Sequence, residues 1–471
     1  MRVLFVTSEM YPYAKTGGLA DVSFSLPRAL RRKGIEVISV MPLYEFIDRK
    51  KFGIKKLGKK VSVNLDGKNY IFEIFAKNNT FFFRNEELFR GSHVYGPAGW
   101  GYEDSDLRFG GFCWAVAKSL EEGIFKVDVV HVNDWPSSLL PVLIKEIYRW
   151  DLKVILTIHN IAFQGIFERD TIERLSLPPY LFNMEALEFW GKVNLLKGGI
   201  VYSDYITTVS STYAEDIMTQ EYGYGLEGVL KKYRHKIKGI LNGIDVYVWN
   251  SRTDRKIYRN FSIRNIDLKE ENKRRLFKEL NIEDCERPLF AFINRLTHQK
   301  GVEIILESVE ELSRLPAVFF FLGEGEYGSV FREIGNIYEN IITRIVFDDT
   351  FARRLYSAAD FIMMPSFFEP CGLSHMIGMR YGCIPLVRET GGLADTVVDI
   401  SEREGYGIMF KNPNKWEFLC AVKRAIELYR NKKYLKEIRR KVLRIDFSWR
   451  RFADEYVKLY NEGNKSFLAY Y

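Results

Sequence analysis

The feature that most constrains the fold is a repeated hexapeptide, TGGLAD, which occurs at residues 16–21 and again at residues 390–395. Each copy follows a short apolar run, RVLFV at 2–6 or CIPLV at 383–387, and precedes a segment with apolar residues at helical spacing. A short apolar run, then glycines, then a helix is typical of the βα units of a parallel sheet. The repeat therefore predicts two α/β lobes, each directing a Gly-Gly loop at one cleft.

The first copy has the composition of an anion-binding loop, because Lys15 precedes it. Gly17 and Gly18 allow a backbone to approach a ligand closely, and the N–H groups at a helix start attract anions. Two glycines can equally form a tight turn with no further role. The residues of this one loop leave both interpretations open, and its repetition favours a binding role.

Strand-like and helix-like segments alternate through almost the whole chain of 471 residues. We predict an α/β protein with a first lobe over 1–248, a second lobe over 249–448 and a C-terminal helix over 449–471. The polar stretch after residue 250 is predicted to be a linker, and the last helix, with Phe452, Tyr456 and Leu459 on one side, to cross back to the first lobe. Residues 54–83 are predicted to form an antiparallel excursion on one edge, and residues 108–122 and 136–149 to form helices.

The composition narrows the possible partners and compartments. A net charge of +8 is modest for this length, so it does not indicate nucleic acid and suits an anionic ligand such as a phosphate ester. The five cysteines include no C-x-x-C pair, and no apolar window reaches the length of a signal peptide or membrane span. These features predict a cytoplasmic protein without a membrane partner. No His/Cys group has zinc spacing, so the sequence does not indicate a metal site. We expect no cofactor either.

Ligands of open parallel sheets bind at the carboxyl ends of the strands, so the polar residues that follow each predicted strand are candidate site residues. The first lobe contributes Asp134 and His159, and Asn242 lies where that lobe ends. The second lobe contributes Arg295, Lys300, Glu369, Cys371, Gly372, Leu373 and Thr390.

Each of these candidates also has a structural interpretation. Arg295 and Lys300 flank a helix start and suit a diphosphate, but they also fit a solvated basic loop. Glu369 is either a favourable first-turn carboxylate or a group that binds hydroxyls together with nearby N–H groups. His159 is either a structural hydrogen-bonding group or part of the site.

A second glycine motif predicts a different chemistry. GEGEYG at 323–328 follows a predicted strand, fits the G-x-G-x-x-G pattern and has Asp348 twenty residues beyond it, as in a nicotinamide dinucleotide site. Glu324 and Glu326 would repel a pyrophosphate, however, and the motif follows the second strand of its lobe. A nicotinamide-dependent oxidoreductase therefore stays a distant alternative.

The motifs as a set closely resemble those of the bacterial glycogen synthases and the related plant starch synthases. They are KTGGLADV at 15–22, HVNDW at 131–135, TIHNIAFQG at 157–165, LKGGIVYSD at 196–204, YGLEGVL at 224–230, LNGID at 241–245, NRLTHQKG at 294–301, PSFFEPCGL at 365–373 and TGGLADTV at 390–397. They occur in the expected order from the first residues to about residue 400.

The resemblance implies a retaining glycosyltransferase of the GT-B type, with two Rossmann-like lobes around a deep interdomain cleft. It implies transfer of glucose from ADP-glucose to the non-reducing end of an α-1,4-glucan, glycogen or a maltooligosaccharide, without a metal. UDP-glucose as the donor and a noncatalytic glucan-binding protein stay open as alternatives.

The resemblance also implies a role for each candidate residue. Lys15, Gly17, Gly18, Arg295 and Lys300 match phosphate-binding positions. His159 and Glu369 match sugar-binding positions, and Asp134 and Asn242 match positions near the reacting sugar. Phe347 stands where the family often has a tyrosine stacked on adenine, which keeps the ring and loses the hydroxyl. Asn133 stands where histidine is common, and Ser211 stands where proline is common.

Overall fold

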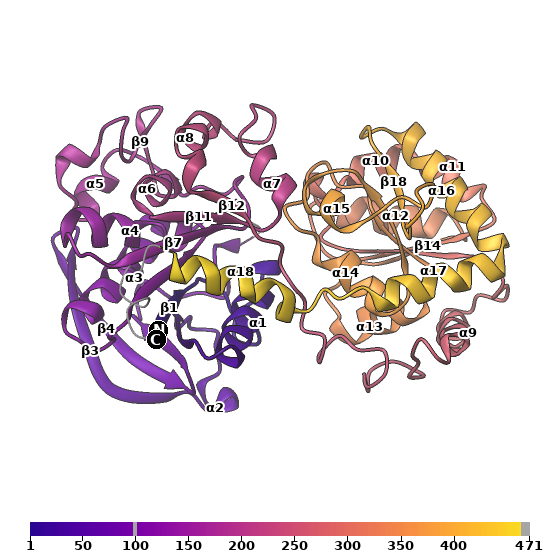
Figure 1. Cartoon of the computed structure of the whole chain (residues 1–471), viewed down its shortest axis with the longest axis horizontal. Coiled ribbons are helices and arrows are strands. Elements are labelled where there is room, and N and C mark those ends of the chain that lie inside the picture. Colours follow the sequence, from indigo (N-terminus) through magenta and orange to yellow (C-terminus); the bar gives the residue numbers. More distant parts are fainter. Residues whose placement is uncertain (98–100, 463–471) are drawn as a thin grey trace, which may run out of the picture. The chain divides into compact units, whose positions relative to one another are not determined.

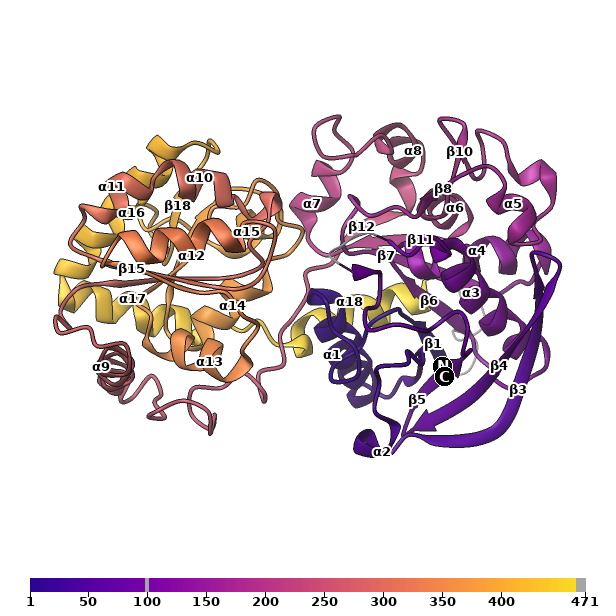
Figure 2. The same ribbon diagram turned by 180° about the vertical axis from the view of Figure 1, so that it is seen from behind.

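The computed structural model describes residues 1–97 and 101–462. It divides into two compact units, both visible in Figures 1 and 2. The first unit contains Met1–Leu241 and the segment that begins at Trp449, and the second contains Asn242–Ser448. The division falls slightly earlier than the predicted boundary after residue 248.

In the described part of the first unit, nine strands form the main sheet in the order β12-β11-β7-β6-β1-β2-β5-β4-β3. The strands are β1 (Arg2–Val6), β2 (Glu36–Pro42), β3 (Lys55–Leu65), β4 (Lys68–Lys77), β5 (Thr80–Arg84), β6 (Val129–Asn133), β7 (Lys153–Ile158), β11 (Tyr205–Thr208) and β12 (Ile237–Gly239). The pairs from β12 through β5 are parallel, whereas β3 and β4 are antiparallel.

The predicted antiparallel excursion is confirmed for the hairpin β3–β4, which lies along one edge of the first unit (Figure 1). β5 also pairs antiparallel with β4, as predicted, but its other side pairs in parallel with β2, so it is not an edge strand. The reason is burial, because Phe82 and Phe83 are fully buried and β5 is therefore an internal strand.

The helices of the first unit are α1 (Gly18–Arg32), α2 (Arg49–Phe52), α3 (Ser105–Glu121), α4 (Leu139–Val142), α5 (Thr171–Arg174), α6 (Leu195–Tyr202), α7 (Ser211–Asp216), α8 (Glu227–Lys232) and α18 (Trp449–Asn461). A small antiparallel sheet contains β8 (Ile166–Phe167), β10 (Lys192–Asn194) and β9 (Glu188–Phe189).

The predicted helix over 136–149 is wrong as one element. It consists of a 3₁₀ turn at Trp135–Ser137, then α4, then a π-helical turn at Leu143–Ile147. Pro136 and Pro141 lack the N–H that a continuous helix requires, and proline is tolerated in a first turn, so each lies near the start of a new segment.

The last helix belongs to the core of the first unit. α18 packs beside α1, and Phe452, Tyr456 and Leu459 are buried in the same cluster as residues of β1 (Figures 1 and 2). His131 of β6 connects α18 to the sheet, with its Nδ1 2.7 Å from the Tyr460 hydroxyl. Burial lowers the pKa of His131 to about 3, so this bridge is uncharged.

In the described part of the second unit, six parallel strands form one sheet in the order β15-β14-β13-β16-β17-β18. The strands are β13 (Leu289–Ile293), β14 (Val318–Leu322), β15 (Ile341–Arg344), β16 (Phe361–Met364), β17 (Ile384–Arg388) and β18 (Ile408–Phe410). The helices are α9 (Lys269–Glu279), α10 (Val302–Glu307), α11 (Val309–Ser313), α12 (Gly328–Ile337), α13 (Asp349–Ala358), α14 (Leu373–Arg380), α15 (Gly391–Thr396), α16 (Lys415–Arg430) and α17 (Lys432–Arg444). Counted along the chain, the strand order is 3-2-1-4-5-6, which is that of the Rossmann fold.

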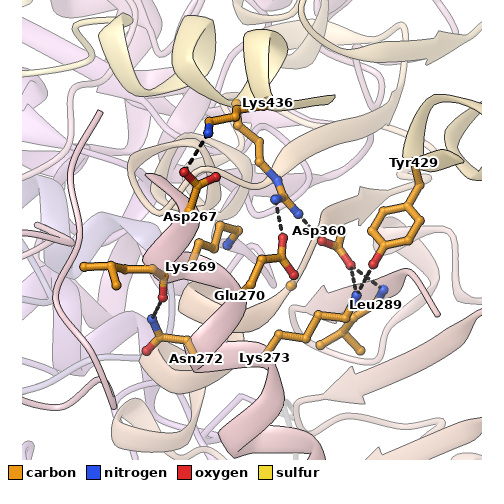
Figure 3. Close-up of polar contacts among 12 residues, drawn as sticks. Asp267, Lys269, Glu270, Asn272, Lys273, Leu289, Asp360, Tyr429 and Lys436 are labelled. Carbon is orange, nitrogen blue, oxygen red and sulfur yellow. Dashed lines mark hydrogen bonds and ion pairs between the residues drawn. The ribbon is translucent and has the colours of Figure 1, made fainter. Parts of the chain in front are cut away.

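The end of the predicted linker is part of this unit's core, because α9 carries a buried ionic cluster (Figure 3). Lys273 Nζ lies 2.7 Å from Asp360 Oδ2 and 2.7 Å from the Tyr429 hydroxyl, while Arg439 of α17 binds the other oxygen of Asp360. The Leu289 N–H at the start of β13 also donates to Asp360. The polar sequence here pairs its charges inside the protein instead of exposing them.

The strand order of each main sheet reverses beside the first strand of its unit. The reversal lies between β1 and β6 in the first unit and between β13 and β16 in the second. The loops that follow these strands diverge at the carboxyl end of the sheet, and such points are where open α/β sheets bind ligands.

Candidate active site

The Lys15 loop follows β1 and ends at α1, at the reversal point of the first sheet. Lys15 Nζ lies 2.7 and 2.9 Å from the two oxygens of Asp21 in the first turn of α1. Gly17 precedes α1, and a Cβ at this position would meet nothing within 4 Å. The packing of the protein does not require a glycine there, so the space beside Gly17 is open to a ligand.

Asp134 follows β6 on the other side of the same reversal point. Its backbone adopts φ 54°, and its Oδ1 accepts hydrogen bonds from the N–H groups of His159 at 2.7 Å and Asn160 at 3.4 Å. Burial, with a smaller contribution from the charge of Glu9, raises the pKa of Asp134 to about 7, although the two N–H donors lower it. This carboxyl group therefore exchanges its proton near neutral pH, as an acid or base of a site does.

His159 follows β7 and is held in a neutral form. Its Nε2 lies 3.0 Å from Asn133 Oδ1, while the Asn133 amide nitrogen donates to the Val6 carbonyl at 2.9 Å. Nε2 is therefore the donor, which leaves Nδ1 with its lone pair. Burial lowers the pKa of His159 to about 3, so it can position or polarise a ligand but is not a proton source at neutral pH.

The structure brings Lys300 and Glu369 together in the second unit. Lys300 ends the 3₁₀ turn after β13 and Glu369 lies in the loop after β16, with Nζ and Oε2 2.5 Å apart. The Ser366 hydroxyl donates to the same oxygen at 3.1 Å. The exposed fractions of the two side chains are 11% and 6%. Lys300, predicted to bind phosphate, and Glu369, predicted to bind sugar, therefore form one largely buried ion pair.

Arg295 is on the same loop as Lys300 but differs from it in being exposed. Its guanidinium donates to Gln299 Oε1 at 3.4 Å, and no ion pair is recorded for it within residues 1–97 and 101–462. An exposed guanidinium bound to a neutral amide is available to an anionic ligand.

Three loops of the second unit contact one another through their backbones, and glycines make this possible. Gly301 adopts φ +70°, and a Cβ there would lie 1.9 Å from the Pro365 carbonyl oxygen. A Cβ on Gly392 would lie 2.4 Å from Cys371 Cα, and the Gly392 N–H donates to the Glu369 carbonyl at 2.9 Å. The second TGGLAD copy therefore holds the Glu369 loop in place.

The two copies of the repeat also start their helices differently. α1 starts at Gly18, whereas α15 starts at Gly391, which is the counterpart of Gly17. Thr390 precedes α15, is buried and makes no side-chain cap.

The remaining predicted residues surround the Glu369 loop or lie at the edge of the sheet. Gly372 adopts φ +82° and precedes α14, which starts at Leu373. Burial raises the pKa of the Cys371 thiol to about 12, so this group is not a nucleophile. Asn242 is buried with an Oδ1 that has no partner among the described residues, and Phe347, beyond β15, is 70% exposed.

The glycines of GEGEYG have a packing role. Gly323 and Gly325 adopt φ +156° and +155°, and a Cβ on them would lie 1.8 Å from the Asn294 carbonyl oxygen and 2.2 Å from that of Leu296. The motif is thus packed against the Arg295 loop, which accounts for its glycines without a dinucleotide.

One residue of the site was missed by the sequence reasoning. Glu9 is nearly buried beyond β1, and its carboxylate binds the Lys15 loop at Thr16 and Gly17. Its position after a strand end, in TSEM, is the signal used for the other candidates and could have identified it.

No described helix is long and apolar enough to cross a membrane. Over the same residues, His, Cys, Asp and Glu side chains do not gather in threes that could hold a metal ion.

Comparisons with known proteins assign the chain to a family. Residues 2–232 match the family model described as starch synthase catalytic domain, and residues 272–442 match the model described as glycosyl transferases group 1. The chain is 56% identical to a glycogen synthase of Aquifex aeolicus, over 98% of this chain and 99% of the relative. It is 40% identical to a glycogen synthase of Thermotoga maritima, with the same coverage.

A solved structure extends these matches to the fold. The catalytic domain of starch synthase IV from Arabidopsis thaliana, bound to ADP and acarbose, aligns with a TM-score of 0.91 and 32% identity over 98% of both chains. Together with the two Rossmann-like sheets, these matches show that the chain belongs to the glycogen synthase and starch synthase family of GT-B glycosyltransferases.

Proposed function

We propose that this enzyme transfers glucose from ADP-glucose to the non-reducing end of an α-1,4-glucan, with retention at the anomeric carbon. The observation that carries the proposal is the Lys300–Glu369 pair beside the exposed Arg295, at the reversal point of a Rossmann sheet. This arrangement offers cations to a diphosphate and a carboxylate to sugar hydroxyls. The ADP and acarbose of the Arabidopsis relative are ligands of the same two classes.

The cationic residues are proposed to receive the charge of the leaving diphosphate. Breaking the sugar–phosphate bond builds negative charge on the phosphate oxygens, and Arg295, Lys300 and Lys15 would bind them. Loss of one such donor typically raises the barrier by about 3–4 kcal/mol. Phe347, which is 70% exposed, would stack on the base.

Glu369 is proposed to orient the sugar. Lys300 and Ser366 hold its carboxylate, so donor binding, which draws Lys300 toward phosphate, leaves Oε2 to accept from sugar hydroxyls. The N–H groups of Cys371, Gly372 and Leu373 would face the same ligand. We favour attack from the face on which the diphosphate leaves, and a glucosyl adduct trapped on Glu369 would contradict this.

The groups beside the reacting sugar are proposed to be Asp134, His159 and Asn242. Asp134 would stabilise the positive charge that develops at the anomeric carbon, and neutral His159 would hold a hydroxyl. Asn242 has a buried oxygen without a partner among the described residues, so a ligand hydroxyl would satisfy it.

Glucose incorporation into a glycogen primer tests the proposal, with ADP-glucose and UDP-glucose compared and no metal added. We expect strong incorporation from ADP-glucose. Incorporation from UDP-glucose alone would keep the reaction and change the donor. If a folded sample of the enzyme incorporates glucose from neither donor, the transferase proposal is refuted. NADH turnover would then favour an oxidoreductase, and glycogen binding would favour a binding protein.

We also propose a cytoplasmic location, supported by five free cysteines.

A further inference from the structure

Glu9 is the centre of a hydrogen-bond cluster around the Lys15 loop. One oxygen of its carboxylate accepts from the Thr16 N–H at 2.5 Å and the Gly17 N–H at 3.3 Å. The other accepts from the Thr16 hydroxyl at 2.6 Å and the Tyr95 hydroxyl at 2.7 Å. The residue is 3% exposed, so this carboxylate exchanges water for four donors of the protein.

Glu9 connects the end of β1 directly to the start of α1. The Thr16 and Gly17 N–H groups are engaged by Glu9, so they point into the protein and not toward a ligand. Lys15, the adjacent residue, is exposed and bound to Asp21. The loop therefore has an inner side held by Glu9 and an outer side that carries the Lys15 charge.

We infer that Glu9 is a positioning residue for the donor substrate, because its carboxylate fixes the backbone from which Lys15 and the first turn of α1 bind the diphosphate. The inference rests on the proposed function. Glu9 itself does not contact the substrate. The Thr16 and Gly17 amides are occupied by Glu9, so Lys15 is the group of this loop that contacts the ligand.

A second observation connects Glu9 to the reacting centre. The charge of Glu9 also raises the pKa of Asp134, by less than burial raises it and by less than either N–H donor lowers it. The titratable groups that face Asp134 are Glu9 and Tyr213, and the N–H groups of His159 and Asn160 are its donors. Removing the Glu9 charge should lower the pKa of Asp134, which a purely structural role in the loop would not require.

The variant Glu9→Gln tests the inference, because it keeps the shape of the side chain but removes the charge and one acceptor oxygen. We expect ADP to bind about tenfold or more weakly in calorimetric titration, since hydrogen bonds to a charged group are lost. The KM for ADP-glucose should rise while that for a maltooligosaccharide stays unchanged. The rise of kcat/KM with pH that accompanies ionisation of Asp134 should move to lower pH.

Glu417→Gln is the matched control. The Glu417 carboxylate also accepts from two consecutive N–H groups, those of Lys411 and Asn412, each at 2.8 Å, before helix α16. This variant should bind ADP like the unsubstituted protein. Thermal unfolding of each variant reports whether it is folded, and Glu9→Asp, which keeps the charge on a shorter stem, replaces Glu9→Gln if the latter does not fold.

The variant Lys15→Ala separates failure of the inference from failure of the proposed function. ADP binding weakened by Lys15→Ala and by Glu9→Gln supports the inference. Binding weakened by Lys15→Ala alone overturns it and leaves the proposed function intact. Binding weakened by neither variant overturns the inference together with the assignment of this loop to phosphate. An enzyme that binds no ADP and transfers no glucose refutes the proposed function itself.

Discussion

The Lys300–Glu369 ion pair leads to a prediction about stability that is separate from catalysis. Removing one partner of a buried ion pair leaves the other charge without compensation, which costs about 3–5 kcal/mol. Both side chains keep some exposure, 11% and 6%, so we expect about 3 kcal/mol for Lys300→Met or Glu369→Gln. The double variant has no uncompensated charge at this position, so its cost should be smaller than the sum of the single costs by at least about 1.5 kcal/mol.

Calorimetry without ligand measures these effects. For a domain of this size, 1 kcal/mol corresponds to about 2–4 °C, so each single variant should lower the Tm of the second unit by about 6–12 °C. Lys15→Met is the control, because Lys15 is also a proposed phosphate ligand but its pair with Asp21 is about 30% exposed and worth less than about 1 kcal/mol. Additive losses, or single variants as stable as Lys15→Met, would refute the idea that the pair is preformed and buried.

Two further predictions concern charges elsewhere in the chain. Asp360→Asn should lower the free energy of unfolding in urea by about 3–5 kcal/mol, because Asp360 is fully buried against two cations. Lys436→Ala, which breaks the exposed Lys436–Asp267 pair drawn in the same view (Figure 3), should cost less than about 1 kcal/mol, and equal losses would contradict the role of burial. For Asp134, the raised pKa of about 7 means that the anion forms only as the pH rises through neutrality. The kcat/KM should rise over the same range and Asp134→Asn should be slow and pH-independent there, whereas a limb that persists in the variant belongs to another group. Stability should change in the opposite direction, because the folded protein disfavours the anion. Stability relative to Asp134→Asn should therefore fall from about pH 4 to about pH 7.

The sequence predicted most of the fold because local patterns are sufficient for it. Apolar runs separated by helical periodicity mark βα units wherever they occur, and the parallel sheets follow from them. The comparisons confirm the predicted family, fold class and enzyme class. The parallel pairing of β5 with β2 was not predicted, because it depends on a strand distant in the sequence. The interruption of the helix over 136–149 was missed although Pro136 and Pro141 mark it in the sequence.

The sequence identified the candidate site residues one at a time, but it did not predict the contacts between them. Each candidate follows a strand end, which is visible in the sequence, but β13 and β16 are neighbours only because the strand order reverses between them. That reversal brings Lys300 to Glu369 across 69 residues of chain. The roles of these residues in substrate binding stay predictions.

By itself, the amino-acid sequence determined the two α/β units, their strands and the residues that stand at the strand ends, because strand and helix periodicity are local properties of the chain. The tertiary structure alone decided the partners of those residues. It assigned the glycines of the second TGGLAD copy to loop packing and buried Glu9 under the first copy. The physical reason is that ion pairing, burial and backbone contact depend on distances in space, and the order of strands in a sheet is not the order of strands in the chain.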